Sequence, residues 1–164
     1  MTRSANLREE TPHDHPEITD LLRAAFHRSG EADLVKALRK AGDLVFGGVA
    51  AIDGDIIGYV ALSRMRAPFP ALGLGPIAVA ATHRQKGVAS TLLHWSLAHV
   101  QKDQWPAIFV LGDGAFYGRF GFRPELAVGF SSPYAGPCFQ ALAVNGELPA
   151  KEGQVDYAPA FDQL

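Results

Sequence analysis

The chain of 164 residues contains a single cysteine, Cys138, which excludes an internal disulfide framework. Strong charge of either sign is also missing. The formal net charge is −2, so the chain lacks the excess of basic residues that is typical of proteins that bind nucleic acid. No apolar run approaches the length of a membrane span, and residues 1–6 lack the apolar core of a signal peptide. These absences predict a cytoplasmic protein that binds neither nucleic acid nor membranes.

The composition that remains is that of an ordinary globular protein. Hydrophobic residues make up 48% and charged residues 20% of the chain. We find no internal repeat, low-complexity tract or linker. Residues 1–164 are therefore predicted to form a single domain, large enough to bury a real core, in which Cys138 is expected to be buried.

The first forty residues predict a short strand followed by two helices. The strand is expected over Leu7–Glu10. Asp14 and Glu17 form a signal like a capping box, with Pro16 near the first helical position, so a helix should follow. A second helix with apolar residues on one face is expected to end near Gly42.

The rest of the chain alternates between strand and helix patterns, interrupted by a proline-rich connection at residues 67–71. Two strands flank Asp53-Gly54, a favourable hairpin turn. The expected elements are strands over Leu44–Ile52, Ile56–Arg64 and Leu74–Val79, a helix from Lys86 to about Lys102, a strand over Ala107–Leu111, a short helix through Phe120, strands near Arg123–Phe130 and Phe139–Val144, and a tail from Pro149 that is mostly loop.

The segment Arg84-Gln85-Lys86-Gly87-Val88-Ala89 joins the strand Leu74–Val79 to the start of a helix. Helix starts have unpaired N–H groups and a partial positive charge, so they bind phosphates well. Gly87 lets the backbone come close to a ligand, and Arg84 and Lys86 add positive charge. The segment predicts a phosphate-binding loop.

A second motif follows the strand Ala107–Leu111. Asp113 can cap a short helix, which Gly121 ends. Within that helix, Tyr117 stands four residues before the pair Gly121-Phe122.

Together these motifs resemble the GCN5-related N-acetyltransferase (GNAT) superfamily, specifically a branch of small predicted bacterial acetyltransferases. The coenzyme loop of the superfamily has the pattern Arg/Gln-x-x-Gly-x-Gly/Ala, matched here by Arg84, Gly87 and Ala89. The resemblance covers nearly the whole chain. It implies a mixed α/β sheet fold with the order β-α-α-β-β-β-α-β-α-β-β and splayed central strands.

The resemblance implies acetyl-CoA as co-substrate and direct attack of an acceptor amine on the thioester. The pyrophosphate would rest on the loop, the pantetheine arm would pair with the strand edge, and the N–H of Val79 or Ala78 would polarise the carbonyl. The implied coenzyme-binding residues are Ile77, Ala78, Val79, Arg84, Gln85, Lys86, Gly87, Val88 and Ala89. Tyr117 would be the catalytic residue that donates a proton to the thiolate; alternatively, it is a packing tyrosine.

No general base is assigned. Residues 72–79 contain no carboxylate, although many superfamily members carry one there. Glu31, Asp113 and His83 are candidates, each with a purely structural alternative, and an ordered water could instead relay the proton. The missing base motivates a second hypothesis, an acyl-CoA-binding sensor or regulatory module without efficient turnover.

The acceptor is a small-molecule or peptide amine that the sequence does not specify. Arg64, Arg66 and Phe69 could border its pocket. His13-x-His15 lacks further ligands at useful spacing, so no metal site is expected. Relatives in the superfamily commonly form dimers through C-terminal strands, and a homodimer through Phe139–Val144 would fit that pattern.

Overall fold

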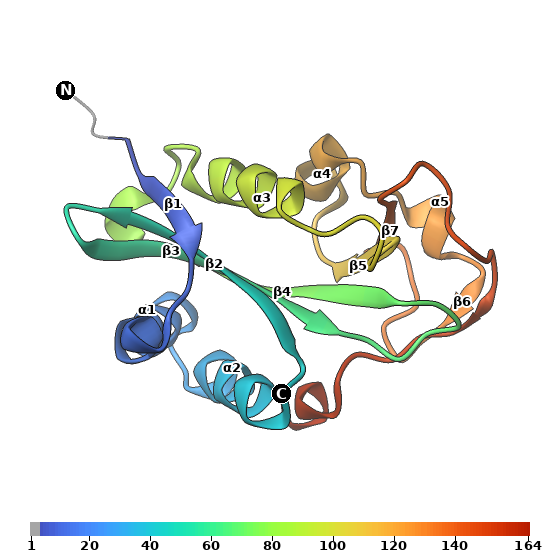
Figure 1. Ribbon diagram of the computed structural model, residues 1–164, viewed down its shortest axis with the longest axis horizontal. Helices are drawn as coiled ribbons and strands as arrows, with labels where there is room; N and C mark the ends of the chain where they lie inside the picture. The colour runs from blue at the N-terminus through green and yellow to red at the C-terminus, as the bar shows by residue number, and fades with distance from the viewer. Residues whose placement is uncertain (1–3) are drawn as a thin grey trace. The chain divides into compact units, whose positions relative to one another are not determined.

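The computed structural model describes residues 4–164 (Figure 1). The chain divides into two compact units. Unit 1 runs up to Leu62 and includes Gly75–His99 and Pro159–Leu164. Unit 2 contains Ser63–Leu74 and Val100–Ala158. The expectation of one domain over residues 1–164 stays a prediction.

Unit 1 contains the N-terminal strands and the three longest helices. Its elements are β1 (Asn6–Glu9), the 3-10 turn η1 (Pro12–Asp14), α1 (His15–Phe26), α2 (Gly30–Ala41), β2 (Leu44–Ile52), most of β3 (Asp55–Arg64), the end of β4 (Ala71–Val79), η2 (Ala81–His83), α3 (Val88–Ala98) and η4 (Pro159–Gln163).

Unit 2 contains shorter elements. They are the end of β3, the start of β4, β5 (Ala107–Leu111), α4 (Gly114–Tyr117), η3 (Gly118–Phe120), α5 (Pro124–Ala127), β6 (Phe130–Ser131), β7 (Phe139–Ala143) and β8 (Gly153–Gln154).

The strand order of the main sheet is β1-β2-β3-β4-β5-β7, and β3 and β4 run through both units. β1 lies antiparallel to β2, and β5 lies antiparallel to β7. β4 and β5 are parallel, in a register that covers only Ala71–Gly73 against Ala107–Phe109. A separate two-stranded sheet joins β6 and β8. The mixed α/β fold expected from the resemblance is confirmed.

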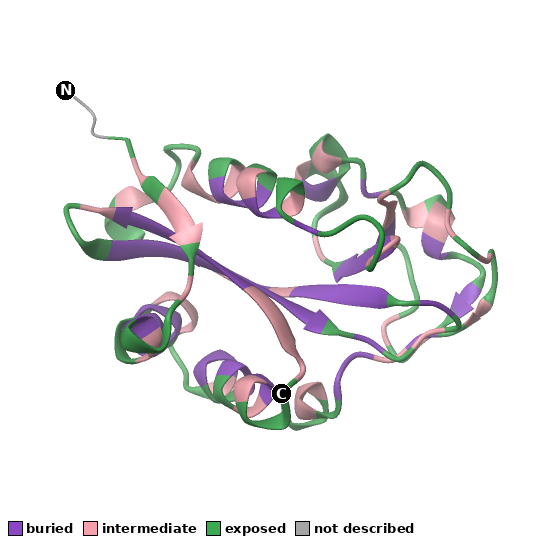
Figure 2. Ribbon diagram, viewed as in Figure 1, coloured by how far each residue is buried: buried purple, intermediate pink, exposed green. Residues whose placement is uncertain are grey.

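In unit 1, alternate residues of β2 and β3 point to opposite faces, as strand geometry requires. Val49 and Tyr59 join the core formed by α1 and α2, where Ile18 and Leu22 are fully buried. On the other face, Gly58 lies so close to Val88 and Leu92 of α3 that an added Cβ would contact both. Figure 2 shows buried residues along these strands.

The core of unit 2 is aromatic. The Phe109 ring stacks on the Phe139 ring at 5.5 Å between centroids. Phe130 meets Phe109 edge-on at 5.5 Å and Phe69 edge-on at 5.7 Å. These contacts fix β5 against β7 and hold the segment that follows α5.

Three local predictions were wrong. A strand was expected near Arg123–Phe130, but Pro124–Ala127 form α5, because Pro124 occupies the first helical position, where its missing N–H and fixed φ cost nothing. Of the expected strand only Phe130 lies in one, β6. Helix α3 begins at Val88 and ends at Ala98, inside the predicted limits. Cys138 is exposed on the loop before β7.

The expected capping box lies one turn earlier than predicted. The Asp14 carboxylate accepts a hydrogen bond from the Thr11 N–H at 2.8 Å and pairs with Arg8 at 2.7 Å. Glu17 instead accepts from the N–H of Ile56 at 2.6 Å, which ties α1 to the start of β3.

Candidate functional site

The turn before α3 is shaped by two residues with left-handed backbone. Gln85 has a φ of 62° and Gly87 a φ of 78°, and the helix begins directly afterwards at Val88. Left-handed residues in a turn create concavities that present backbone N–H groups to anions. A Cβ added at Gly87 would meet no atom within 4 Å, so the side of the turn that Gly87 faces is open.

The charges around this turn favour an anion. Residues 84–87 are exposed, and Arg84 and Lys86 bring two cations to the start of α3. The first turn of α3 contains no acidic residue. The positive end of the helix dipole is therefore left uncompensated by the helix itself, and a bound phosphate would stabilise it.

A hydrogen bond connects the turn to the end of β4. Arg84 Nε donates to the Val79 carbonyl at 3.2 Å. Ala78 is buried, whereas Ile77 and Val79 are half-buried, as expected for alternate faces of a strand. The predicted coenzyme-binding residues of β4 and of the loop thus belong to one connected part of unit 1.

Tyr117 lies in unit 2, at the end of α4. Asp113 caps that helix by accepting from the Ala115 N–H at 3.0 Å, as the sequence predicted, and Gly121 ends the following turn with a φ of 98°. The Tyr117 side chain is buried, and its ring meets Phe122 edge-on at 5.8 Å. Burial, helped by the charge of Asp113, raises the pKa of the Tyr117 hydroxyl above its usual value near 10. The hydroxyl therefore remains protonated at neutral pH.

The three candidate bases all have structural partners. Glu31 accepts from Arg28 Nε at 2.9 Å, and this contact lowers the pKa of Glu31, which makes its carboxylate a weaker base. Asp113 caps α4, and His83 Nδ1 lies 2.8 Å from the Thr82 hydroxyl. None is assigned as the base.

The residues considered for an acceptor pocket also have packing roles. Phe69 is buried against Phe130. The Arg64 guanidinium lies 5.7 Å from the centre of the Trp105 ring. The backbone of Arg66 pairs with that of Asp156. Arg64 and Arg66 remain exposed, so an acceptor could still meet either one.

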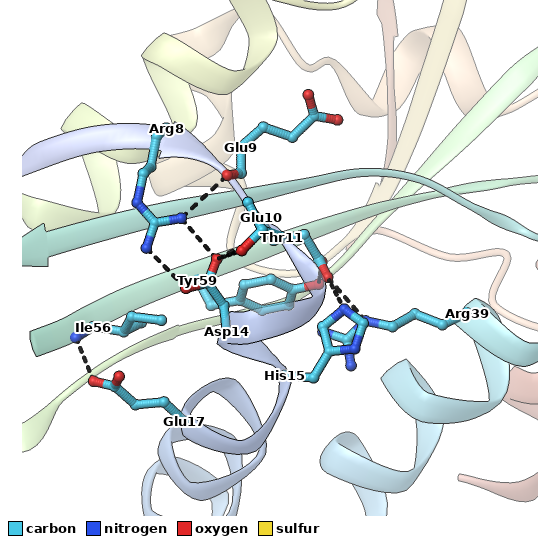
Figure 3. Close-up of polar contacts among 10 residues, drawn as sticks. All are labelled: Arg8, Glu9, Glu10, Thr11, Asp14, His15, Glu17, Arg39, Ile56 and Tyr59. Carbon is cyan, nitrogen blue, oxygen red and sulfur yellow. Dashed lines mark hydrogen bonds and ion pairs between the residues drawn. The ribbon is translucent and has the colours of Figure 1, made fainter. Parts of the chain in front are cut away.

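A polar cluster around Glu10 did not emerge from the sequence (Figure 3). The Glu10 carboxylate accepts from Arg39 Nε at 2.9 Å and from the Tyr59 hydroxyl, and lies 3.0 Å from His15 Nε2. Burial and the Glu10 charge raise the pKa of Tyr59 well above its ordinary value. Because the partners come from three different elements, no local pattern could have revealed the cluster.

Residues 4–164 contain neither a cluster of metal-ligating side chains nor a helix suited to a membrane. Within that range no group of three or more His, Cys, Asp or Glu side chains is placed to hold a metal ion. Over the same range no helix combines the length and the apolar character needed to cross a membrane.

Comparison with known proteins matches residues 6–124 to the family described as "Acetyltransferase (GNAT) domain". The uncharacterized N-acetyltransferase YhbS of Escherichia coli K12 is 41% identical over 121 residues, which cover 71% of this chain and 72% of YhbS. The uncharacterized N-acetyltransferase YjhQ of the same strain is 30% identical over 137 residues, covering 76% of this chain and 73% of YjhQ.

Two solved structures resemble the whole chain. The structure of E. coli YhbS in complex with CoA superimposes with a TM-score of 0.87 and 34% identity, covering 99% of this chain and 94% of that one. A GNAT family acetyltransferase from Brucella melitensis in complex with acetyl-CoA superimposes with a TM-score of 0.81 and 30% identity. The match covers 98% of this chain and 100% of that one. Fold, motifs and relatives agree: the chain belongs to the GNAT family of N-acetyltransferases.

Proposed function

We propose that this protein transfers the acetyl group of acetyl-CoA to an acceptor amine by direct attack, without a covalent enzyme intermediate. The observation that carries the proposal is the open turn of residues 84–87 with its two left-handed residues, its two cations and an acid-free helix start behind it. The Brucella melitensis relative, which was solved with acetyl-CoA, supports the same coenzyme here.

The coenzyme would be held by backbone groups of unit 1. Its pyrophosphate accepts hydrogen bonds from the N–H groups of Gln85–Ala89, while Arg84 and Lys86 supply charge. Its pantetheine arm lies along Ile77–Val79. The N–H of Val79 or Ala78 then stabilises the oxyanion that develops on the thioester carbonyl.

The chemistry has two bond changes. The neutral amine attacks the carbonyl carbon, and a C–N bond forms while the carbonyl electrons move to oxygen. When the oxyanion collapses, the C–S bond breaks and the thiolate takes the hydroxyl proton of Tyr117. The ammonium proton passes to water, and water returns a proton to the Tyr117 phenolate, which restores the enzyme. The raised pKa of Tyr117 keeps the phenol protonated at neutral pH, as a proton donor must be, while it also makes the phenol a weaker acid toward the thiolate.

One observation favours the alternative, an acyl-CoA sensor without efficient turnover. The carboxylates Glu31 and Asp113 are engaged by Arg28 and by the start of α4, so neither is free to act as base. Release of coenzyme thiol, measured with a panel of amines, separates the two functions. Sustained amine-dependent release excludes the sensor, and coenzyme binding without release for every amine of the panel favours it.

Several properties follow as expectations. The acceptor is a small-molecule or peptide amine, and the enzyme acts in the cytoplasm. β7 is the last strand in the order of the main sheet, and the backbone of Arg123 already pairs with Ala141 on its outer edge. Pairing of two copies through the rest of this edge would give a homodimer. Sedimentation equilibrium would show whether the protein is a dimer.

The decisive test is calorimetric titration of acetyl-CoA into the wild type, Gly87→Glu and Gly42→Glu. Gly42 is a matched control because it has nearly the same backbone, with a φ of 77° against 78° at Gly87, and equally open surroundings. Both variants therefore add the same strain and charge. We expect micromolar binding that only Gly87→Glu abolishes. No binding by a folded wild type would overturn the coenzyme assignment.

A further inference from the structure

A pocket of about 680 Å³ lies between α1 and α2 in unit 1, within the size range of small-molecule sites. Its lining is unusually cationic for a chain with a net charge of −2. The charged and titratable residues that line it are His15, Asp20 and Arg23 on α1 and Lys36, Arg39 and Lys40 on α2.

Two of these residues, His15 and Arg39, are held in place by the carboxylate of Glu10 (Figure 3). The buried carboxylate of Glu10 binds Arg39 Nε at 2.9 Å and lies 3.0 Å from His15 Nε2. The Tyr59 hydroxyl donates to the other oxygen of Glu10. Arg39 Nη2 is buried and has no hydrogen-bond acceptor among residues 4–164. The Arg39 guanidinium, which lines one wall of the pocket, is thus held in a fixed orientation and has N–H groups left to donate to a ligand.

The other three cations have no compensating partner. Within the described chain, no ion pair or hydrogen bond ties Arg23, Lys36 or Lys40 to an acceptor, and all three are exposed. Lys36 and Lys40 are four residues apart on one helix, a spacing at which like charges repel. Asp20 is the one carboxylate in the lining.

The helix dipole explains only part of this arrangement. Arg39 and Lys40 lie in the last turn of α2, where cations are favourable. Arg23 lies in the last turn of α1, where a cation is likewise favourable. Lys36 gains nothing from either last turn, yet it lines the same pocket.

We infer that this α1–α2 pocket binds a small molecule carrying at least two oxyanion groups, either phosphates or carboxylates. Arg39 would bind one oxyanion group by donating hydrogen bonds from its guanidinium N–H groups. Arg23, Lys36 and Lys40 would neutralise the remaining negative charge of the ligand. The lining shares no residue with the loop 84–89, so the site is distinct from the coenzyme loop and does not depend on the proposed function.

The test is calorimetric titration of inorganic pyrophosphate and, separately, of citrate into the protein without coenzyme. The pocket variant is Lys36→Gln/Lys40→Gln. Its matched control, Lys102→Gln/Lys151→Gln, removes the same charge at two exposed lysines of unit 2. Lys86→Gln reports any binding at the coenzyme loop. Thermal melts confirm that each variant folds.

We expect at least one probe to bind the pocket variant about tenfold more weakly than the wild type, and to bind the control as tightly as the wild type. Any additional binding that Lys86→Gln weakens is assigned to the coenzyme loop. Binding of pyrophosphate alone identifies phosphate as the preferred group, and binding of citrate alone identifies carboxylate. Binding of neither probe overturns the inference, as does equal weakening in the pocket variant and its control. Loss confined to Lys86→Gln also overturns it, because the probe then occupies the coenzyme loop.

Discussion

The ring of Tyr117 lies against Gly112 so closely that a Cβ added at Gly112 would come within 2.5 Å of ring carbon Cε2. Gly112 itself is fixed on both sides. Its N–H donates to the Cys138 carbonyl at 3.0 Å, and its carbonyl accepts from Gln140 Nε2 at 3.3 Å. A side chain at this position therefore cannot be accommodated by a shift of the backbone, and the tyrosine must move instead.

Gly112→Ala should displace the Tyr117 ring and lower turnover by about tenfold to a hundredfold, because a proton donor misplaced by about 1 Å loses much of its effect. The affinity for acetyl-CoA should change little, since the coenzyme loop lies elsewhere in the sequence. Steady-state kinetics and calorimetry measure the two quantities.

Gly118→Ala is the control for that change, because an added Cβ there meets no atom within 4 Å and the backbone is helical. Equal losses in the two variants would show that the contact between Gly112 and Tyr117 does not position a catalytic group.

Tyr117→Phe should lower kcat by about a hundredfold or more while leaving acetyl-CoA affinity nearly intact, as expected for loss of a general acid. Because burial raises the pKa of Tyr117, the neutral phenol persists to high pH. Any fall in wild-type kcat caused by this group should therefore begin above about pH 10. Joint loss of turnover and coenzyme affinity in the variant would contradict the acid role.

Lys86→Gln should weaken acetyl-CoA binding about fivefold to tenfold, since it removes one cation from an exposed phosphate site. Exposed charges are screened by salt, so the loss should be largest at low ionic strength and shrink at high ionic strength. Calorimetry at two salt concentrations tests this. A loss that does not vary with salt would mean that Lys86 acts through the backbone of the turn.

Helix caps, helix ends and strands could be predicted from the sequence wherever residues close together in the chain determine them. The cap at Asp113, the end at Gly121 and the glycine of the coenzyme loop all depend on residues a few positions apart. The strand pattern over Ala107–Leu111 was likewise sufficient, because a continuous apolar run predicts a strand buried on both faces.

Long-range features were not readable in this way. Glu10 meets Arg39 and Tyr59 only after β1, α2 and β3 are assembled. The α1–α2 pocket likewise joins Arg23 to Lys36 across two helices. Hydrophobic periodicity places each element but does not say which polar side chains meet. The sequence therefore predicted the turn before α3 but revealed neither of these features.

The pair of Arg8 and Asp14 gives a prediction about stability. The Asp14 carboxylate is buried, accepts two hydrogen bonds from Arg8 at 2.7 and 2.9 Å, and also accepts from the Thr11 N–H. These contacts, those of Arg8 foremost, hold the pKa of Asp14 well below its usual range. Asp14→Asn should therefore lower the free energy of unfolding by about 1.5–3 kcal/mol at pH 7, the range for hydrogen bonds to charged groups.

The sign of the pH dependence follows from the lowered pKa. The stabilisation is fully present above the unfolded pKa near 4 and is lost as the pH falls toward the folded value, because the unfolded chain then binds the proton more readily. The difference in melting temperature between wild type and Asp14→Asn should thus be constant from pH 7 to about pH 5 and narrow below about pH 4. Thermal melts across that range test it, and a difference that grows in acid would mean that Asp14 is not held ionised in the fold.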